Sequence, residues 1–179
     1  QSEQGNDLFE ACPGGAPCNV LAMLNEMGKK TAFIGKVGKD QFGKLLRNTL
    51  NDIGIDTSNL FTDSTVNTTL AFVHTLEDGD REFSFYRNPG ADMMLTEDEI
   101  NTTFISQAKI FHFGTLSMTQ DSVRAATKKA VKAAKESGAL ISFDPRMQFS
   151  TIIAGFNGRG TITPNIIPPS LTPWISHSD

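Results

Sequence analysis

Residues 14–19 read GGAPCN. Apolar residues recur at helical spacing from Pro17 to Met27 and predict a helix there. Pro17 is suited to the first turn of this helix, and Gly28 is suited to end it. Two adjacent glycines let the backbone approach a bound group without an intervening Cβ. Free amides at a helix start favour polar or anionic ligands, and the side chain of Asn19 both donates and accepts hydrogen bonds, as vicinal sugar hydroxyls do. Taken alone, the hexapeptide is also explained by a tight turn into a helix.

Further along the chain, strand and helix patterns alternate with short connections. Asp40 is placed to cap a helix, and Thr96 with Glu99 forms a capping-box pattern. This order predicts an α/β fold, in which helices cover a mainly parallel sheet. The expected strands are 31–37, 109–113 and 139–143, and the expected helices are 17–27, 40–53, 96–106 and 119–137.

Two further strands, 68–76 and 81–87, are predicted to form a hairpin around the turn signal at residues 77–80. Their alternation of polar and apolar residues indicates that one face is wet or covers a ligand. Ligands of open α/β sheets bind beyond the carboxyl ends of the strands. Residues 35–38, Gly114 and Asp144 fall at those ends, and Asp144 is therefore a candidate cleft residue.

Composition excludes several classes of function. The 179 residues carry a net charge of −4, which argues against broad binding of nucleic acid or of anionic membranes. No apolar run approaches the roughly 18 residues that span a bilayer. The spacing of Cys12 and Cys18 suits neither a zinc site nor a secreted disulfide framework, and the three histidines form no cluster, so we expect no metal site and a cytoplasmic protein.

The composition changes near residue 146. Residues 1–146 hold 34 of the 36 charged residues, whereas residues 147–179 hold only Arg159 and Asp179 together with four of the eight prolines. We therefore interpret 1–146 as the folded part and expect 147–179 to be poorly structured. A frameshifted, non-native extension explains this composition.

Five spaced residues of the first part resemble the first signature of the PfkB/ribokinase family of sugar kinases. Leu21 departs from that signature, which usually has a small residue there. The segment FSFYRNPGAD (83–92), taken with GGAPCN, is most similar to bacterial fructokinases, and the resemblance covers roughly residues 9–145. The residues that match the signature are Gly14, Gly15, Asn19, Gly28 and Gly38.

The resemblance implies a three-layer, ribokinase-like α/β fold with a parallel sheet, here truncated, and with the hairpin protruding as a lid over the sugar. It implies that Gly14, Gly15, Asn19 and Arg87 bind the substrate. For Arg87 the alternative is an ion pair with Glu82 or Asp92. Asp144 resembles the aspartate of a family Asp-Pro-Asn segment, but Arg146 stands where Asn is expected, and a capping or structural role is the alternative.

The resemblance also implies what this sequence lacks. In the family a late Gly-Ala-Gly-Asp segment supplies the anion hole and the catalytic aspartate base, and no such segment occurs here. No residue is therefore assigned as catalytic. ATP and Mg²⁺ are expected as cofactors of a full-length parent, and none is expected for this chain.

Two functions from different classes remain open. One is an ATP-dependent sugar kinase that converts fructose to fructose 6-phosphate, represented here by its sugar-binding part. The other is a non-catalytic remnant that binds sugar or pairs through its exposed hairpin as a homodimer. The substrate also stays open, because kinases of 2-keto-3-deoxygluconate and of nucleosides share the Gly-Gly motif.

Overall fold

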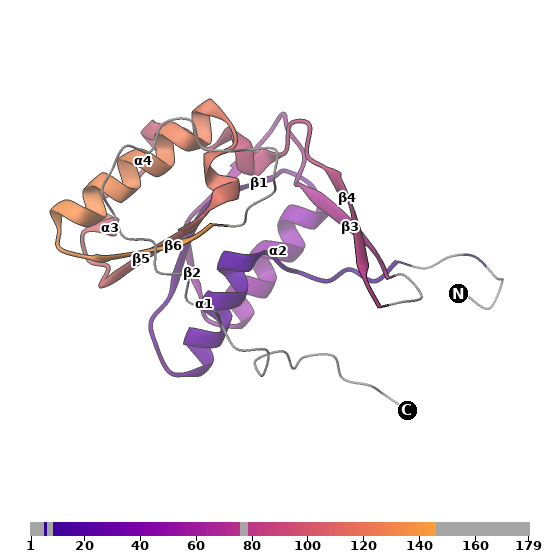
Figure 1. Cartoon of the computed structure of the whole chain (residues 1–179), viewed down its shortest axis with the longest axis horizontal. Coiled ribbons are helices and arrows are strands. Elements are labelled where there is room, and N and C mark those ends of the chain that lie inside the picture. The colour runs from indigo at the N-terminus through magenta and orange to yellow at the C-terminus, as the bar shows by residue number, and fades with distance from the viewer. Residues whose placement is uncertain (1–5, 7–8, 76–78, 146–179) are drawn as a thin grey trace. The chain divides into compact units, whose positions relative to one another are not determined.

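A computed structural model describes residues 6, 9–75 and 79–145, all of which belong to the unit Gln1–Arg146. The predictions for residues 147–179 and for the turn residues 77–78 lie outside the described residues. Figure 1 shows the arrangement of the elements. In chain order these are α1 (Ala16–Glu26), β1 (Ala32–Gly38), α2 (Gln41–Asp52), β2 (Asp56–Asp63), β3 (Leu70–Thr75), β4 (Arg81–Tyr86), α3 (Thr102–Ile105), β5 (Ile110–Gly114), α4 (Asp121–Glu136) and β6 (Leu140–Asp144), with 3₁₀ turns at Ala91–Met94, Glu97–Glu99 and Thr115–Met118.

The α/β class is confirmed, and the parallel strands occur as two pairs. β1 pairs with β2 and β5 with β6, both parallel, whereas β3 and β4 form the predicted antiparallel hairpin. Within the described residues these are three separate two-stranded sheets, not one continuous ladder. The strand β2 was not expected, because its sequence DTSNLFTD carries only two adjacent apolar residues and no alternation.

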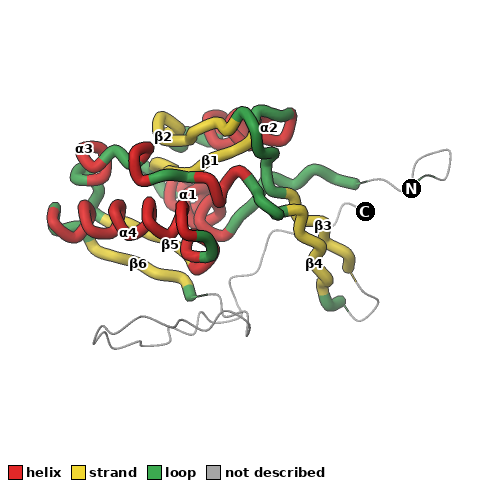
Figure 2. The backbone as a smooth tube through the Cα atoms, turned by 90° about the horizontal axis from the view of Figure 1, so that it is seen from above, coloured by secondary structure: helices red, strands yellow, loops and turns green. Residues whose placement is uncertain are grey.

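The strands of the two parallel pairs lie between α3 and α4 on one face and α1 and α2 on the other (Figure 1), whereas the hairpin of β3 and β4 projects to one side (Figure 2). On one face Ile34 of β1 and Phe111 of β5 pack in a core with α3 and α4. Successive strand residues point to opposite faces, and Phe33 and Val37 of β1 accordingly join a second core with α1 and α2. The two parallel pairs thus share one buried layer although they form no common ladder.

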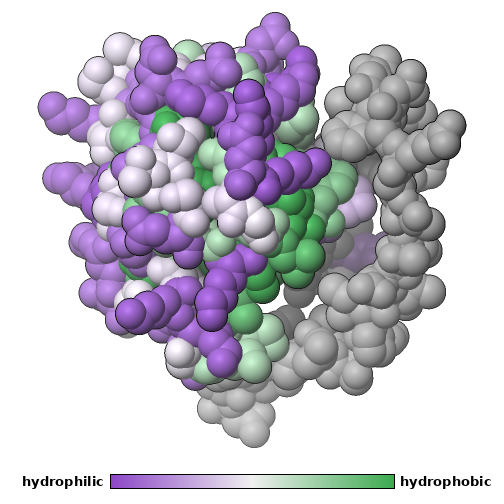
Figure 3. Space-filling view, turned by 90° about the vertical axis from the view of Figure 1, so that its left-hand side faces the viewer, coloured by the Kyte–Doolittle hydropathy of each residue, from purple (hydrophilic) through white to green (hydrophobic). Residues whose placement is uncertain are grey.

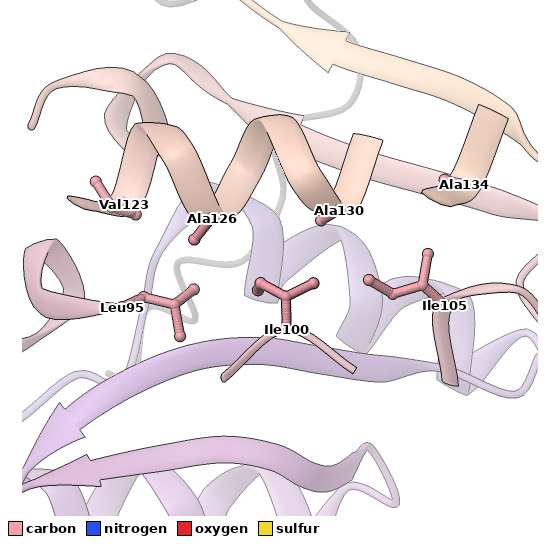
Figure 4. Packing of buried hydrophobic residues seen from close by; sticks show 7 residues of the cluster. All are labelled: Leu95, Ile100, Ile105, Val123, Ala126, Ala130 and Ala134. Atoms are coloured by element: carbon pink, nitrogen blue, oxygen red, sulfur yellow. The ribbon is translucent and has the colours of Figure 1, made fainter. Parts of the chain in front are cut away.

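The first core depends on small side chains along α4 (Figure 4). Ala126, Ala130 and Ala134 recur every four residues, which places them on one face of the helix, and they are almost fully buried. Their lack of bulk lets the helix approach the segment that carries Leu95, Ile100 and Ile105. A helix rich in Ala and Lys is therefore buried on its alanine face.

The predicted helix over 96–106 is wrong in its extent. The capping box exists, because the Glu99 carboxylate accepts hydrogen bonds from the backbone nitrogen and hydroxyl of Thr96. The chain nevertheless becomes extended at Ile100, whose side chain is buried, and Asn101 then caps the separate short helix α3 by accepting from Phe104 N at 3.0 Å. Burial of Ile100 and a second cap together divide the segment.

Some apolar surface stays uncovered in the described part of the chain. Ile110 of β5 and Leu140 and Phe143 of β6 are exposed, and an apolar area is visible on the face shown in Figure 3. On α1, Val20 and Met23 are exposed as well, and so is Met27 directly after the helix. Contiguous exposed apolar surface favours association with other apolar surface.

Candidate functional site

The start of α1 is open around Gly15. Gly15 caps the helix with a φ of 122°, a conformation that L side chains rarely adopt, and no side chain caps the helix start. No atom lies within 4 Å of the position that a Cβ on Gly15 would occupy. The side chain of Asn19, one turn into the helix, is exposed, and its backbone nitrogen donates to Gly15 O at 3.0 Å. Backbone amides and a side-chain amide are therefore accessible together.

Cys18 lies in the same first turn but carries no nucleophilic thiolate. Burial raises the pKa of its thiol to about 11, so the thiol stays protonated at neutral pH. Cys18 instead joins the apolar core beneath α1. The polar chemistry of this helix start consequently rests on the glycine backbone and on Asn19.

Arg87 follows β4 and lies at the root of the hairpin. Its Nε and Nη2 donate to the same Asp92 oxygen at 2.8 and 2.6 Å. Nη2 also donates to Leu116 O at 3.2 Å, and Nη1 donates to the Thr119 hydroxyl at 3.3 Å. The ion pair with Asp92, one of the two partners considered from the sequence, is therefore present. Four of the five N–H donors of the guanidinium are used, and one on Nη1 has no partner in the described part of the chain.

Asp144 ends β6 directly opposite Gly114 of β5. Its backbone carbonyl accepts a hydrogen bond from the Thr115 hydroxyl at 3.2 Å. Its carboxylate is half-buried and makes no hydrogen bond or ion pair with any described residue. The structure thus puts Asp144 at the strand end that the sequence predicts, and its chemical role stays a prediction.

Two of the candidate residues, Arg87 and Asp144, lie at the carboxyl edge of the strands. Arg87 contacts Leu116 and Thr119 just beyond β5, and Asp144 pairs with the last residue of β5. The far end of α1 lies at the opposite edge, because Asn25 donates to Gly54 O and to the Thr31 hydroxyl, which precede β2 and β1. The start of α1 therefore faces the carboxyl edge, although no described contact joins it to Arg87.

Two threonines at the entry to the hairpin were missed by the sequence analysis. Thr68 donates from its backbone nitrogen and its hydroxyl to the Asp40 carboxylate, at 2.7 and 2.9 Å. Thr69 donates from its hydroxyl to Asp92. The sequence predicts Asp40 only as a helix cap, and it does cap α2, because it accepts from Gly43 N at 2.8 Å. No apolar period marks these threonines, so pattern analysis passes over them.

Hydrogen bonding controls the ionisation of Asp40. Desolvation alone would raise the pKa of this carboxyl, but the hydrogen bonds donated by Thr68 and Gly43 outweigh it, and the pKa lies below the ordinary value. Asp40 is therefore a charged acceptor at neutral pH. Among the described residues no three His, Cys, Asp or Glu side chains gather as a metal site would require, and no helix is long and apolar enough to cross a membrane.

Comparison with known proteins connects this geometry to one family. The profile of the pfkB family of carbohydrate kinases matches residues 6–166. The chain is 46% identical over 140 residues to fructokinase-1 of Zea mays, and the match covers 78% of this chain and 43% of the maize protein. A fructokinase of Solanum tuberosum matches at the same identity over 44% of its length. The chain thus spans less than half the length of these relatives.

Solved structures agree on the fold. The fructokinase of Xylella fastidiosa superposes with a TM-score of 0.73 at 33% identity, and the match covers 80% of this chain and 46% of that chain. A putative ribokinase II of Escherichia coli reaches a TM-score of 0.75 at 28% identity, covering 83% of this chain and 48% of its own. The fold is therefore ribokinase-like. With its profile, sequence and fold in agreement, the chain belongs to the pfkB family of carbohydrate kinases.

Proposed function

We propose that this chain carries the acceptor-binding part of a fructokinase-like kinase, which in the full-length parent transfers phosphate from ATP to the 6-hydroxyl of fructose. The observation that supports this most is the open start of α1, with Gly15 unobstructed and Asn19 exposed. The curated relatives named above are fructokinases.

In this proposal the sugar hydroxyls bind to the amides at Gly14 and Gly15, to the Asn19 side chain and to the unpartnered N–H of Arg87. An amide side chain both donates and accepts, as a hydroxyl does, so Asn19 orients the sugar by paired hydrogen bonds. Asp92 neutralises the guanidinium and holds its plane, which keeps the remaining donor in one direction. These residues bind the acceptor and orient it. Such contacts contribute to phosphoryl transfer by holding the acceptor in the geometry that the reaction needs.

We assign neither the nucleotide nor Mg²⁺ to the described residues of this chain. Structures of relatives were determined with ATP, and in one case with ATP and Mg²⁺. The described residues hold no acidic cluster that fits a metal, and the sequence has no Gly-Ala-Gly-Asp segment. We therefore propose that both cofactors serve the full-length kinase.

The experiment that tests the proposal is a calorimetric titration of the purified chain with fructose, 2-keto-3-deoxygluconate and adenosine. We expect saturable binding of fructose that is at least tenfold tighter than binding of the other two. Tighter binding of 2-keto-3-deoxygluconate or adenosine would assign the site to one of the alternative substrates. Absence of binding to all three at millimolar concentration would contradict a sugar site.

We also propose that two copies pair through the hairpin. Register places Ala71, Val73, Phe83 and Phe85 on one face, where Phe83 and Phe85 stay 51% and 54% exposed. An exposed apolar cluster of this kind favours burial against a copy of itself. Sedimentation should show a dimer that Phe85→Asp disrupts and that Ser84→Asp, on the opposite face of the same strand, leaves intact. A monomeric wild-type chain would contradict this pairing.

A further inference from the structure

Two chain segments, the entry leg and the exit leg, connect the hairpin to the rest of the molecule, and each of them is hydrogen-bonded to a carboxylate. Thr68 and Thr69 stand at the entry, immediately before β3, and Arg87 stands at the exit, immediately after β4. Thr68 bonds to Asp40, whereas Thr69 and Arg87 both bond to Asp92. Neither carboxylate belongs to the hairpin itself, so both attach the hairpin to the part of the molecule from which it projects.

The entry leg is tightly enclosed. The Thr68 side chain is buried, and its hydroxyl donates to Asp40 Oδ1 while it accepts from Gly38 N at 2.9 Å. A Cβ at Gly38 would collide with the backbone nitrogen of Thr68, and a Cβ at Gly43 would collide with Gly38 O. The close approach thus requires glycine at both positions, and it fixes the entry leg against the end of β1 and the start of α2.

The exit leg is fixed to a different part of the molecule. Arg87 reaches past Asp92 to Leu116 O and to the Thr119 hydroxyl, both beyond the end of β5. Directly between the legs, Ala91 N donates to Asn67 O at 2.9 Å. The Thr69 hydroxyl, which bonds to Asp92, lies so close to Gly90 that a Cβ there would collide with it. The exit leg therefore connects the hairpin to the β5 side of the carboxyl edge.

We infer that Asp40 and Asp92 are positioning residues, which together hold the root of the hairpin and thereby the guanidinium of Arg87 at the carboxyl edge of both parallel strand pairs. Adjacent residues of an extended chain point in opposite directions, so the side chains of Thr68 and Thr69 connect the two carboxylates across one short segment. The rigidity of this root does not depend on a ligand. Its consequence for sugar binding rests on the proposed function.

A pair of substitutions at Thr68 separates hydrogen bonding from shape. Val has nearly the shape of Thr but no hydroxyl, whereas Ser keeps the hydroxyl and loses a methyl group. We expect Thr68→Val to accelerate hydrogen exchange of the Ala91 amide and of the hairpin amides nearest the root at least tenfold, and Thr68→Ser to change these rates less than threefold. Amides of Ala126 and Ala130 in α4 report the exchange that passes through global unfolding. Equal exchange rates of these amides in Thr68→Val and Thr68→Ser would overturn the inference.

A second variant keeps the test decisive if Thr68→Val does not fold. Asp40→Asn preserves the helix cap, because Asn caps about as well as Asp, but its Nδ2 faces the Thr68 N–H and cannot accept from it. The matched control is Asp56→Asn, since Asp56 accepts from Ser58 N within β2, away from the hairpin. Asp40→Asn should raise the exchange rate of the Thr68 amide at least tenfold, and Asp56→Asn should leave it unchanged. Protection retained in Asp40→Asn would contradict the role of Asp40.

The fructose titration distinguishes this inference from the proposed function. If the wild-type chain binds fructose, we expect Thr68→Val to weaken binding at least fivefold and Thr68→Ser to restore it to within twofold. A mobile root with unchanged fructose affinity would reject the positioning role. If the wild-type chain binds no fructose, the proposed function fails, while the exchange rates still decide whether the contact between Thr68 and Asp40 holds the root.

Discussion

Arg87 donates two hydrogen bonds to a single oxygen of Asp92, from Nε at 2.8 Å and from Nη2 at 2.6 Å. The side chain of Arg87 is 14% exposed and that of Asp92 is 40% exposed, so the guanidinium is shielded from water more than in an ordinary surface pair. The pair orients the guanidinium while leaving one N–H of Nη1 without a partner among the described residues. An ion pair and a ligand contact are therefore compatible at Arg87.

Replacing Arg87 by Lys should destabilise the chain. Lys retains the charge but has no planar fork, so it cannot bond Asp92, Leu116 O and Thr119 together. We expect Arg87→Lys to lower the free energy of unfolding by about 1–2 kcal/mol in urea titrations. The control is Arg124→Lys, whose more exposed pair with Asp121 should contribute less than about 0.5 kcal/mol. Equal losses in the two variants would contradict a special role for the Arg87 fork.

Acid should weaken the fold through Asp63. Hydrogen bonds from the backbone and hydroxyl of Thr65, and from Val66 N, lower the pKa of this carboxyl to about 2. Because the folded-state pKa lies below that of the unfolded chain, the resulting stability is fully present above about pH 4 and disappears as the pH falls toward 2. Urea midpoints between pH 5 and 2 should fall steeply in the wild-type chain.

The Asp63→Asn variant tests that assignment. An amide does not titrate, so the fall of the urea midpoint with pH should be shallower in Asp63→Asn than in the wild-type chain. Asp98→Asn, at an exposed position, is the control and should follow the wild-type curve. If the urea midpoints of all three proteins fall equally with pH, Asp63 does not cause the loss of stability in acid.

Truncating a buried side chain of the first core should lower the free energy of unfolding. Ile105 is 2% exposed and packs against the alanine face of α4. We expect Ile105→Ala to lower the free energy of unfolding by about 2–5 kcal/mol, because the removed atoms lose burial and leave a cavity. Ile110→Ala, at a position that is 57% exposed, should cost less than about 1 kcal/mol. Similar losses would show that the described core does not hold the fold.

The chain of 179 residues should form no fructose 6-phosphate from fructose and ATP. Phosphoryl transfer needs the nucleotide held in line and charge stabilised on the transferred group, in addition to a bound acceptor. A coupled assay with purified chain, ATP and Mg²⁺ measures this against a mock-purified control. Activity above that control would contradict the assignment of this chain to acceptor binding alone.

Local signals in the sequence were sufficient to predict several elements. Gly28, Gly54 and Gly138 follow helices with positive φ, as the predicted helix ends require. Asp40 caps α2, and the hairpin forms where its turn signal lies. Each of these features depends on a few neighbouring residues, which is why a single sequence carries them.

Features that depend on tertiary contacts are harder to predict from the sequence. The strand β2 forms because it pairs with β1 and buries Asn59 and Leu60, although its own pattern is polar. For the candidate site, the sequence motifs indicate the individual residues, and Asp92 was foreseen only as one partner of Arg87. The connection from Thr68 to Asp40 spans 28 residues, and no local pattern reports such a contact.

A fructose titration of the ¹⁵N-labelled chain, followed by NMR, measures whether fructose binds at the start of α1. We expect saturable shifts of the Gly14, Gly15 and Asn19 amides and of Arg87 Nε. Asn19→Ala should weaken the affinity roughly tenfold, because a polar partner of the sugar is left unmet. Asn48→Ala, at another exposed helical asparagine, should bind as the wild-type chain does. Shifts confined to other parts of the chain, or equal affinities of the Asn19→Ala and Asn48→Ala variants, would contradict the assignment.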